Sequence, residues 1–120
     1  MIDINKTFTF SIDETFLLKN NLYSTKWVIP NNLPYFEGHF PNNPVLPAIA
    51  LIDLVLYIIS KIEVSSPIKI KSIQTAKFSE VYIPGDIVLI KLEKKESKKW
   101  AANLSKENGI KNSKMTINLA

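Results

Sequence analysis

The stretch that most constrains this chain is an apolar run, residues 45–59, that follows directly on a proline-rich loop. The run is too short to span a bilayer, which needs roughly 20 apolar residues, and it contains Pro47 and Asp53. We therefore expect a buried helix that starts at Pro47, where the missing N–H of proline costs nothing, and continues from Ala48 to about Glu63. Because this helix is apolar on nearly all sides, other elements must cover it.

Two titratable side chains stand out at this stretch, namely His39 in the loop and Asp53 within the predicted helix. An ionised carboxylate among Ile, Leu and Val is costly without a partner, so Asp53 should face water or a functional site, or keep its proton. An imidazole and a carboxyl group at an apolar cleft are the two groups that acid–base catalysis needs. The simpler alternatives are a loop histidine satisfied by hydrogen bonds and a helix acid that caps a neighbour or pairs with a lysine.

The loop before the helix, Pro30 to Pro44, carries four prolines and two Asn-Asn pairs. No regular element is expected to survive that density of prolines. The loop should nevertheless be stiff, because proline restricts both the unfolded and the folded chain. Such a loop could hold an imidazole in one orientation.

Alternating apolar and polar residues predict antiparallel strands on both sides of the helix. Asn20-Asn21 is a plausible hairpin turn before the helix. After the helix we expect a break at Ser65-Ser66-Pro67 and then three turns, at Pro84-Gly85-Asp86, residues 94–99 and Glu107-Asn108-Gly109. One sheet must bury one apolar helix, so we expect a single α+β domain, residues 1–120, with an antiparallel sheet wrapped around the helix. The predicted strands are Lys6–Ile12, Phe16–Lys19, Leu22–Ile29, Ile68–Phe78, Ile87–Glu93, Trp100–Lys106 and Ile110–Leu119.

Composition excludes several classes of function. The net charge is +4, but every basic residue is a lysine, and the absence of arginine argues against sequence-specific nucleic-acid binding. The lysines are scattered, which indicates solvated strand faces, although they could also attract an acidic partner. There is no cysteine, which excludes thiolate catalysis, disulfides and Cys-type zinc sites. The N-terminal residues do not resemble a secretory signal, and we expect a cytoplasmic protein with no membrane span.

The loop and the start of the helix share a long motif with a known family. The motif is Phe36-x-Gly38-His39-Phe40-Pro41-x-x-Pro44-Val45-x-Pro47, with an acid, Asp53, fourteen residues after the histidine. It resembles the 3-hydroxyacyl-[acyl-carrier-protein] dehydratases of the hot-dog fold. Because the acid is Asp rather than Glu, the chain looks most like the short dehydratases of aryl-polyene-type lipid pathways. The resemblance covers roughly residues 30–119.

This resemblance implies roles for individual residues. His39 would remove a proton from the carbon next to the thioester carbonyl, and Asp53 of the other subunit of a dimer would protonate the departing 3-hydroxyl. The backbone N–H of Ala48 would polarise the thioester oxygen at the helix N-terminus, and a dry slot between helix and sheet would take the acyl tail. The family usually has Gly at position 48, but a backbone N–H is available from alanine as well. The residues expected to bind substrate are Gly38, Phe40, Val45, Pro47 and Ala48.

The sequence therefore predicts a dimeric hot-dog enzyme that converts a 3-hydroxyacyl carrier-protein thioester to the trans-2-enoyl thioester without metal or organic cofactor. A homodimer is the first expectation and a heterodimer with a related subunit the second. Three alternatives stay open: a hot-dog acyl thioesterase that uses Asp53 and water, a non-catalytic partner subunit, and a lipid-binding module. Tyr57, Trp27 and Trp100 are interpreted as packing residues, and Glu37 as an exposed loop acid.

Overall fold

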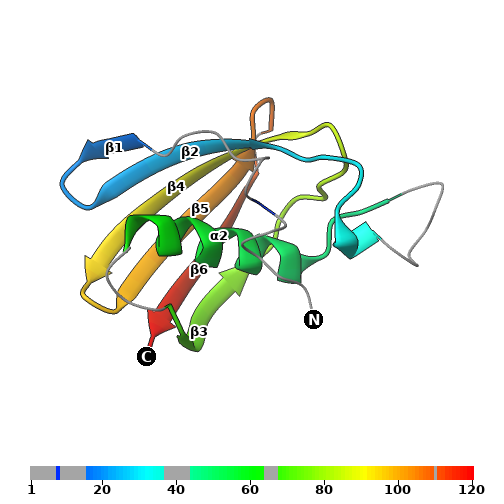
Figure 1. Cartoon of the computed structure of the whole chain (residues 1–120). Helices are drawn as coiled ribbons and strands as arrows, with labels where there is room; N and C mark the ends of the chain where they lie inside the picture. The colour runs from blue at the N-terminus through cyan, green and yellow to red at the C-terminus, as the bar shows by residue number, and fades with distance from the viewer. Residues whose placement is uncertain (1–7, 9–15, 37–43, 64–67, 110) are drawn as a thin grey trace.

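The computed structural model describes residues 8, 16–36, 44–63, 68–109 and 111–120. Within these residues a six-stranded antiparallel sheet curves around one long helix, α2, which lies across one face of the sheet (Figure 1). In chain order the elements are β1 (Phe16–Lys19), β2 (Leu22–Val28), the 3-10 turn η1 (Pro34–Phe36), α2 (Ala48–Ile62), β3 (Ile70–Lys77), β4 (Ile87–Glu96), β5 (Lys99–Lys106) and β6 (Asn112–Leu119).

The strand order in the sheet is β1-β2-β4-β5-β6-β3. The hairpin before the helix joins the strands after it through β2 and β4, where Trp27 lies opposite Val88. At the other side β3 pairs with β6 alone and forms an edge of the sheet. Since β3 is the last strand in the order, no described strand pairs with its outer edge, and its residues Ile70 and Ile73 are exposed.

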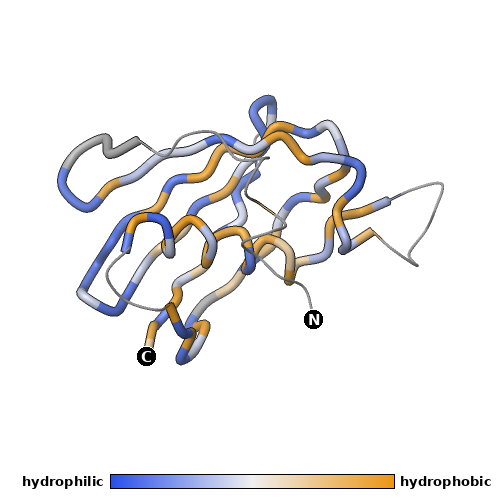
Figure 2. The backbone as a smooth tube through the Cα atoms, viewed as in Figure 1, coloured by the Kyte–Doolittle hydropathy of each residue, from blue (hydrophilic) through white to orange (hydrophobic). Residues whose placement is uncertain are grey.

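The core lies between the sheet and α2. Alternate residues of β4, β5 and β6 are buried, as expected for strands with one covered face. Most of α2 is hydrophobic along its length, whereas the β4–β5 turn is hydrophilic (Figure 2). The buried residues of α2 are Ala50, Leu51, Leu54, Val55, Tyr57, Ile58 and Ile59.

A second stripe of α2 is not buried by the chain's own sheet. It is formed by residues three or four apart, which share one face of a helix. Ile49 is 54% exposed, and the others are half-buried. The stripe is apolar except for Asp53 and Ser60, so α2 presents a second face that needs cover. We call Ile49, Ile52, Asp53, Leu56 and Ser60 the open stripe.

The structure confirms the α+β architecture, the hairpin at Asn20-Asn21 and the buried helix. Asn21 takes a positive φ of 63°, as the predicted turn requires. Trp27 and Trp100 are fully buried core residues. Tyr57 is also buried, which confirms the packing interpretation.

Four boundary predictions were wrong. Phe8 is helical rather than part of a strand, and its ring is completely buried against other aromatic rings; the rest of residues 6–12 lies outside the described residues. Pro47 caps the helix instead of opening it, with an extended backbone. The loop before the helix contains η1, and the turn predicted at 94–99 shrinks because β4 continues to Glu96, where it pairs with Lys99.

Candidate active site

The candidate site is built around Asp53, which lies on the open stripe of α2. Its carboxylate accepts a hydrogen bond from the Tyr35 hydroxyl, with 2.6 Å between the phenol oxygen and Oδ2. The two residues are 18 positions apart in the sequence, so this bond joins the loop to the helix. The costly polar group in the apolar helix therefore has a partner, and the partner is a tyrosine rather than a lysine or a neighbouring backbone group.

Tyr35 is held in place by the turn that carries it and by an aromatic cluster. The η1 turn is closed by a hydrogen bond from the Phe36 N–H to the Leu33 carbonyl at 3.1 Å. The Tyr35 ring is only 5% exposed and lies 6.3 Å from the Phe8 ring, which in turn lies 5.8 Å from Tyr57. Since Tyr57 is one turn after Asp53 on α2, the cluster fixes the tyrosine against the same helix as the acid.

The environment keeps Tyr35 protonated. Burial raises the pKa of its hydroxyl far above the ordinary value of 10.0, and the hydrogen bond to Asp53 and the charge of that carboxylate raise it further. An O–H group that does not ionise remains a hydrogen-bond donor over the whole physiological range of pH. Asp53 therefore has a permanent donor at Oδ2, and Oδ1 is the oxygen left for other chemistry.

The N-terminus of α2 lies five residues before Asp53. Pro47 caps it with φ −72° and ψ 156° and supplies no side-chain hydrogen bond. The first N–H groups of any helix have no acceptor within it, and Ala48 is exposed. The segment before the helix is anchored by a hydrogen bond from the Leu46 N–H to the Tyr82 carbonyl at 2.8 Å. This end of α2 can therefore bind an oxygen that carries negative charge.

Four large apolar side chains surround this end of the helix without being covered. Val45 and Val81 are 39% and 57% exposed, and Ile49 and Ile83 are 54% and 42% exposed. The Leu46–Tyr82 hydrogen bond brings their two segments together. An apolar surface of this kind commonly marks a contact with a protein or a ligand. We call Val45, Ile49, Val81 and Ile83 the apolar shelf.

The predicted site residues divide into two groups. Asp53, Val45, Pro47 and Ala48 are described, and all four lie in or just before α2. The other predicted residues, Gly38, His39 and Phe40, and also Glu37, lie outside the described residues. The predicted roles of both groups stay predictions.

Sequence reasoning missed Tyr35. It stands directly before the first residue of the motif, but no role was assigned to it. Two general rules together would have found it, since a buried tyrosine hydroxyl needs a hydrogen-bond partner and so does a carboxylate in an apolar helix.

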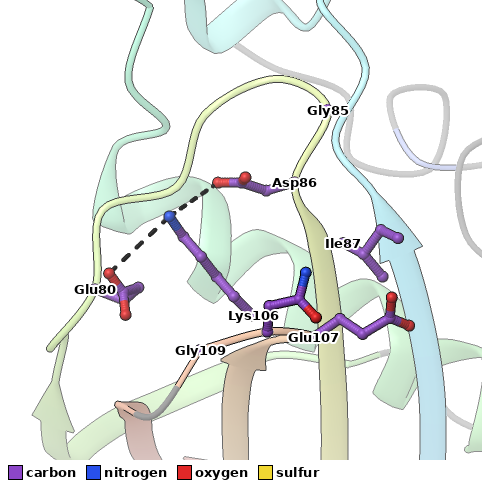
Figure 3. A pocket seen from close by; sticks show the side chains of 8 residues that line it. Glu80, Gly85, Asp86, Ile87, Lys106, Glu107 and Gly109 are labelled. Carbon is purple, nitrogen blue, oxygen red and sulfur yellow. Dashed lines mark ion pairs between the residues drawn. The ribbon is translucent and has the colours of Figure 1, made fainter.

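Two pockets formed by described residues lie away from Asp53. One, of about 520 Å³, is lined by Glu80, Asp86 and Lys106 among others, and Lys106 Nζ lies 3.1 Å from Asp86 Oδ2 and 4.0 Å from Glu80 Oε1 (Figure 3). Its charges satisfy one another, as in a structural ion-pair network. The other, of about 350 Å³, lies over β4, β5 and β6 and is lined by solvated lysines such as Lys91 and Lys114.

Two kinds of site can be assessed for the described residues. No three His, Cys, Asp or Glu side chains among them gather to hold a metal ion. No helix in the described part of the chain is long and apolar enough to cross a membrane.

Comparison with protein families places these features in a known context. A family model described as ApeI-like, ApeI dehydratase, matches residues 17–115. The 3-hydroxyacyl-[acyl-carrier-protein] dehydratase FabZ of Gluconobacter oxydans is 31% identical over 87 residues, which cover 66% of this chain and 50% of that protein. The FabZ of Ehrlichia ruminantium is 36% identical over 69 residues, covering 51% and 48%. The chain thus spans about half the length of the curated relatives it matches.

Solved structures agree on the fold. The dehydratase heterocomplex ApeI:P from Xenorhabdus doucetiae superposes with a TM-score of 0.76 at 22% identity, covering 91% of this chain and 96% of that one. A hypothetical thioesterase with coenzyme A from Streptococcus pneumoniae superposes with a TM-score of 0.61 at 11% identity, covering 89% and 84%. Identities this low establish the fold alone, and the predicted hot-dog fold is confirmed.

The raised pKa of Tyr35 predicts how stability changes at alkaline pH. Below about pH 10 the tyrosine is protonated in both the folded and the unfolded chain, so its contribution to stability is complete. Above that pH only the unfolded chain ionises, and the contribution is lost as pH rises, by at most about 1.4 kcal/mol per pH unit. The difference in unfolding free energy between wild type and Tyr35→Phe, measured with urea, should therefore narrow above about pH 10. A difference that does not change with pH would contradict the raised pKa.

Proposed function

The chain belongs to the ApeI-like dehydratase family, and from that premise we propose that it dehydrates a 3-hydroxyacyl thioester, carried by an acyl carrier protein, to the trans-2-enoyl thioester. The observation that carries the proposal is the placement of Asp53. This carboxyl group lies on the open stripe of α2, five residues after the helix N-terminus, where the first N–H groups of a helix have no intrahelical acceptor. An acid beside an oxyanion site is the arrangement that elimination next to a thioester needs.

In the proposed reaction each group has one task. The imidazole of His39 takes a proton from C2, and the electron pair of that C–H bond becomes the new C2–C3 double bond. The C3–O bond breaks, and the departing hydroxyl takes the proton of Asp53 and leaves as water. The negative charge that develops on the thioester oxygen is held by the Ala48 N–H and the positive end of α2. The proton on His39 returns to Asp53 through solvent, which completes the cycle.

We propose that a second subunit completes the site. The open stripe and the apolar shelf leave hydrophobic surface around Asp53 uncovered, and the edge strand β3 offers unpaired backbone groups. A second copy of this chain is the first candidate. A related subunit is the other, because the similar structure from Xenorhabdus doucetiae is a heterocomplex. His39 of one subunit would then meet Asp53 of the other.

The carrier is proposed from charge. Acyl carrier proteins are acidic, and this chain carries a net charge of +4 that comes entirely from lysine excess. Attraction between opposite charges would speed the encounter of enzyme and carrier. A carrier-protein substrate would also place the reaction in the cytoplasm.

Mass measurement on a 3-hydroxyacyl carrier-protein thioester tests the proposed reaction. The wild-type protein should remove about 18 Da, the mass of the water lost in the elimination. His39→Ala and Asp53→Asn should each slow this loss by about 100-fold or more, since each removes one partner of the proton transfer. Lys98→Ala, in the exposed β4–β5 turn, is the control and should react like wild type.

The same measurement separates the alternatives. Release of the free carrier thiol without an enoyl product would show that the protein hydrolyses the thioester and does not dehydrate the acyl group. If His39→Ala leaves the activity of a reconstituted two-subunit complex unchanged, this chain is a non-catalytic partner.

A proline substitution tests the oxyanion role of Ala48. Proline is well tolerated at the first helical position because that N–H has no partner in the helix, and the extended backbone of Pro47 already suits a following proline. Ala48→Pro should therefore fold normally but lose about 100-fold or more in kcat, the usual effect of removing one oxyanion donor. Ala48→Gly keeps the N–H and should remain active. Full activity of Ala48→Pro would remove this N–H from the mechanism.

A further inference from the structure

The contact between Tyr35 and Asp53 has a chemical consequence that goes beyond packing. The phenol donates to Oδ2 alone, at 2.6 Å. Its ring is almost completely buried in the aromatic cluster, so the hydroxyl has little freedom to move. The half-buried carboxyl group is thereby fixed in one rotamer, and its two oxygens become different from each other.

Few protons are available to the pair formed by Tyr35 and Asp53. A tyrosine hydroxyl has one hydrogen to donate, and burial together with the neighbouring carboxylate raises the pKa of Tyr35, which keeps that hydrogen in place. Because the Tyr35 hydrogen points at Oδ2, a proton carried by Asp53 is left to Oδ1.

We infer that Tyr35 is a positioning residue for the proposed general acid: its hydroxyl holds Oδ2 of Asp53 and so presents Oδ1, with its proton, to the departing 3-hydroxyl group. The inference rests on the proposed dehydration. In the step itself the O–H bond at Oδ1 breaks, the leaving hydroxyl gains the proton, and Asp53 is left as a carboxylate. Tyr35 keeps its own proton throughout.

The hydrogen bond should also become stronger during the reaction. A bond from a neutral hydroxyl to an ionised carboxylate is shorter and stronger than one to a neutral carboxyl group. In the proposed step Asp53 carries a proton while the substrate is bound and becomes a carboxylate as that proton leaves, so Tyr35 would stabilise the transition state more than the bound substrate. An interaction of this kind raises kcat without improving KM.

Tyr35 is also close in sequence to the proposed base. It lies four residues before His39, the proposed base, while its hydroxyl binds the acid on α2 of the same chain. If the acid serves a site completed by the His39 of a second subunit, η1 holds the acid of one site and is close in sequence to the base of the other. A single turn would then support both active sites of a dimer.

Steady-state kinetics of Tyr35→Phe test the inference. The substitution removes only the hydroxyl, and kcat on the 3-hydroxyacyl carrier-protein thioester should fall about 10- to 100-fold, the range for loss of a group that orients a reacting residue. KM should stay within about twofold, because the substrate itself is not contacted. Tyr57→Phe is the matched control, since it removes the hydroxyl of another buried tyrosine in the same aromatic cluster, and its kcat should equal that of wild type.

A double variant shows whether Tyr35 acts through Asp53. In the Asp53→Asn background, Tyr35→Phe should cause no further loss of the residual rate measured by mass in single-turnover reactions. The inference is overturned if Tyr35→Phe keeps the wild-type kcat, if it changes KM alone, or if its loss adds fully to that of Asp53→Asn. A wild-type protein that leaves the thioester unchanged would instead defeat the proposed function, and the inference with it.

Discussion

The burial of α2 is the constraint on which the rest of this structure depends. A helix that is apolar on nearly every side cannot stay in water, and the sheet made by β1 to β6 covers only part of it. The fully buried residues pack on the sheet, whereas the open stripe keeps Ile49, Ile52 and Leu56 at least partly accessible. The carboxyl group of Asp53 lies in that stripe and is held there by the hydrogen bond from Tyr35.

An ionised carboxyl group in an apolar helix lowers the stability of the fold unless it has a hydrogen-bonding or charged partner. Here that partner is Tyr35, which is brought to the helix by a 3-10 turn and an aromatic cluster. Tyr35 is a neutral donor, so it gives the carboxyl group a hydrogen-bond partner without adding a charge. A lysine would instead neutralise the charge of the carboxylate permanently. A group that must give up a proton and take it back needs a neutral partner such as Tyr35. The structural solution to the burial of Asp53 is therefore compatible with a chemical use of it.

Local signals in the sequence were sufficient for much of the fold. The hairpin was predictable because Asn tolerates the positive φ found at Asn21. The helix was predictable because Pro47 marks its start and the residues from Ala48 to Ile59 are apolar except for Asp53. The end of β4 was not predictable, since Lys94 and Glu96 look like turn residues and are strand residues only because they pair with β5. The burial of Phe8 was not predictable either, since the rings that it contacts, those of Trp27 and Tyr57, are far away in the sequence.

The same distinction applies to the site. The motif in the loop and the acid fourteen residues after His39 could be recognised from spacing, because the two are close in sequence. The bond between Tyr35 and Asp53 joins residues 18 positions apart, and no sequence periodicity reports such a contact. Surface that is apolar yet uncovered, such as the shelf around the start of α2, becomes visible only when the chain is folded.

The central claim is that each chain supplies one half of an active site, with Asp53 from one subunit and His39 from its partner. Mixing the two inactive variants His39→Ala and Asp53→Asn after denaturation and refolding tests it most directly. Random reassembly of symmetric dimers would make about half of them mixed, and each mixed dimer would contain one intact site, so about a quarter of wild-type activity should return. If the mixture stays as inactive as its two components, the halves do not come from different copies of this chain and the account is contradicted.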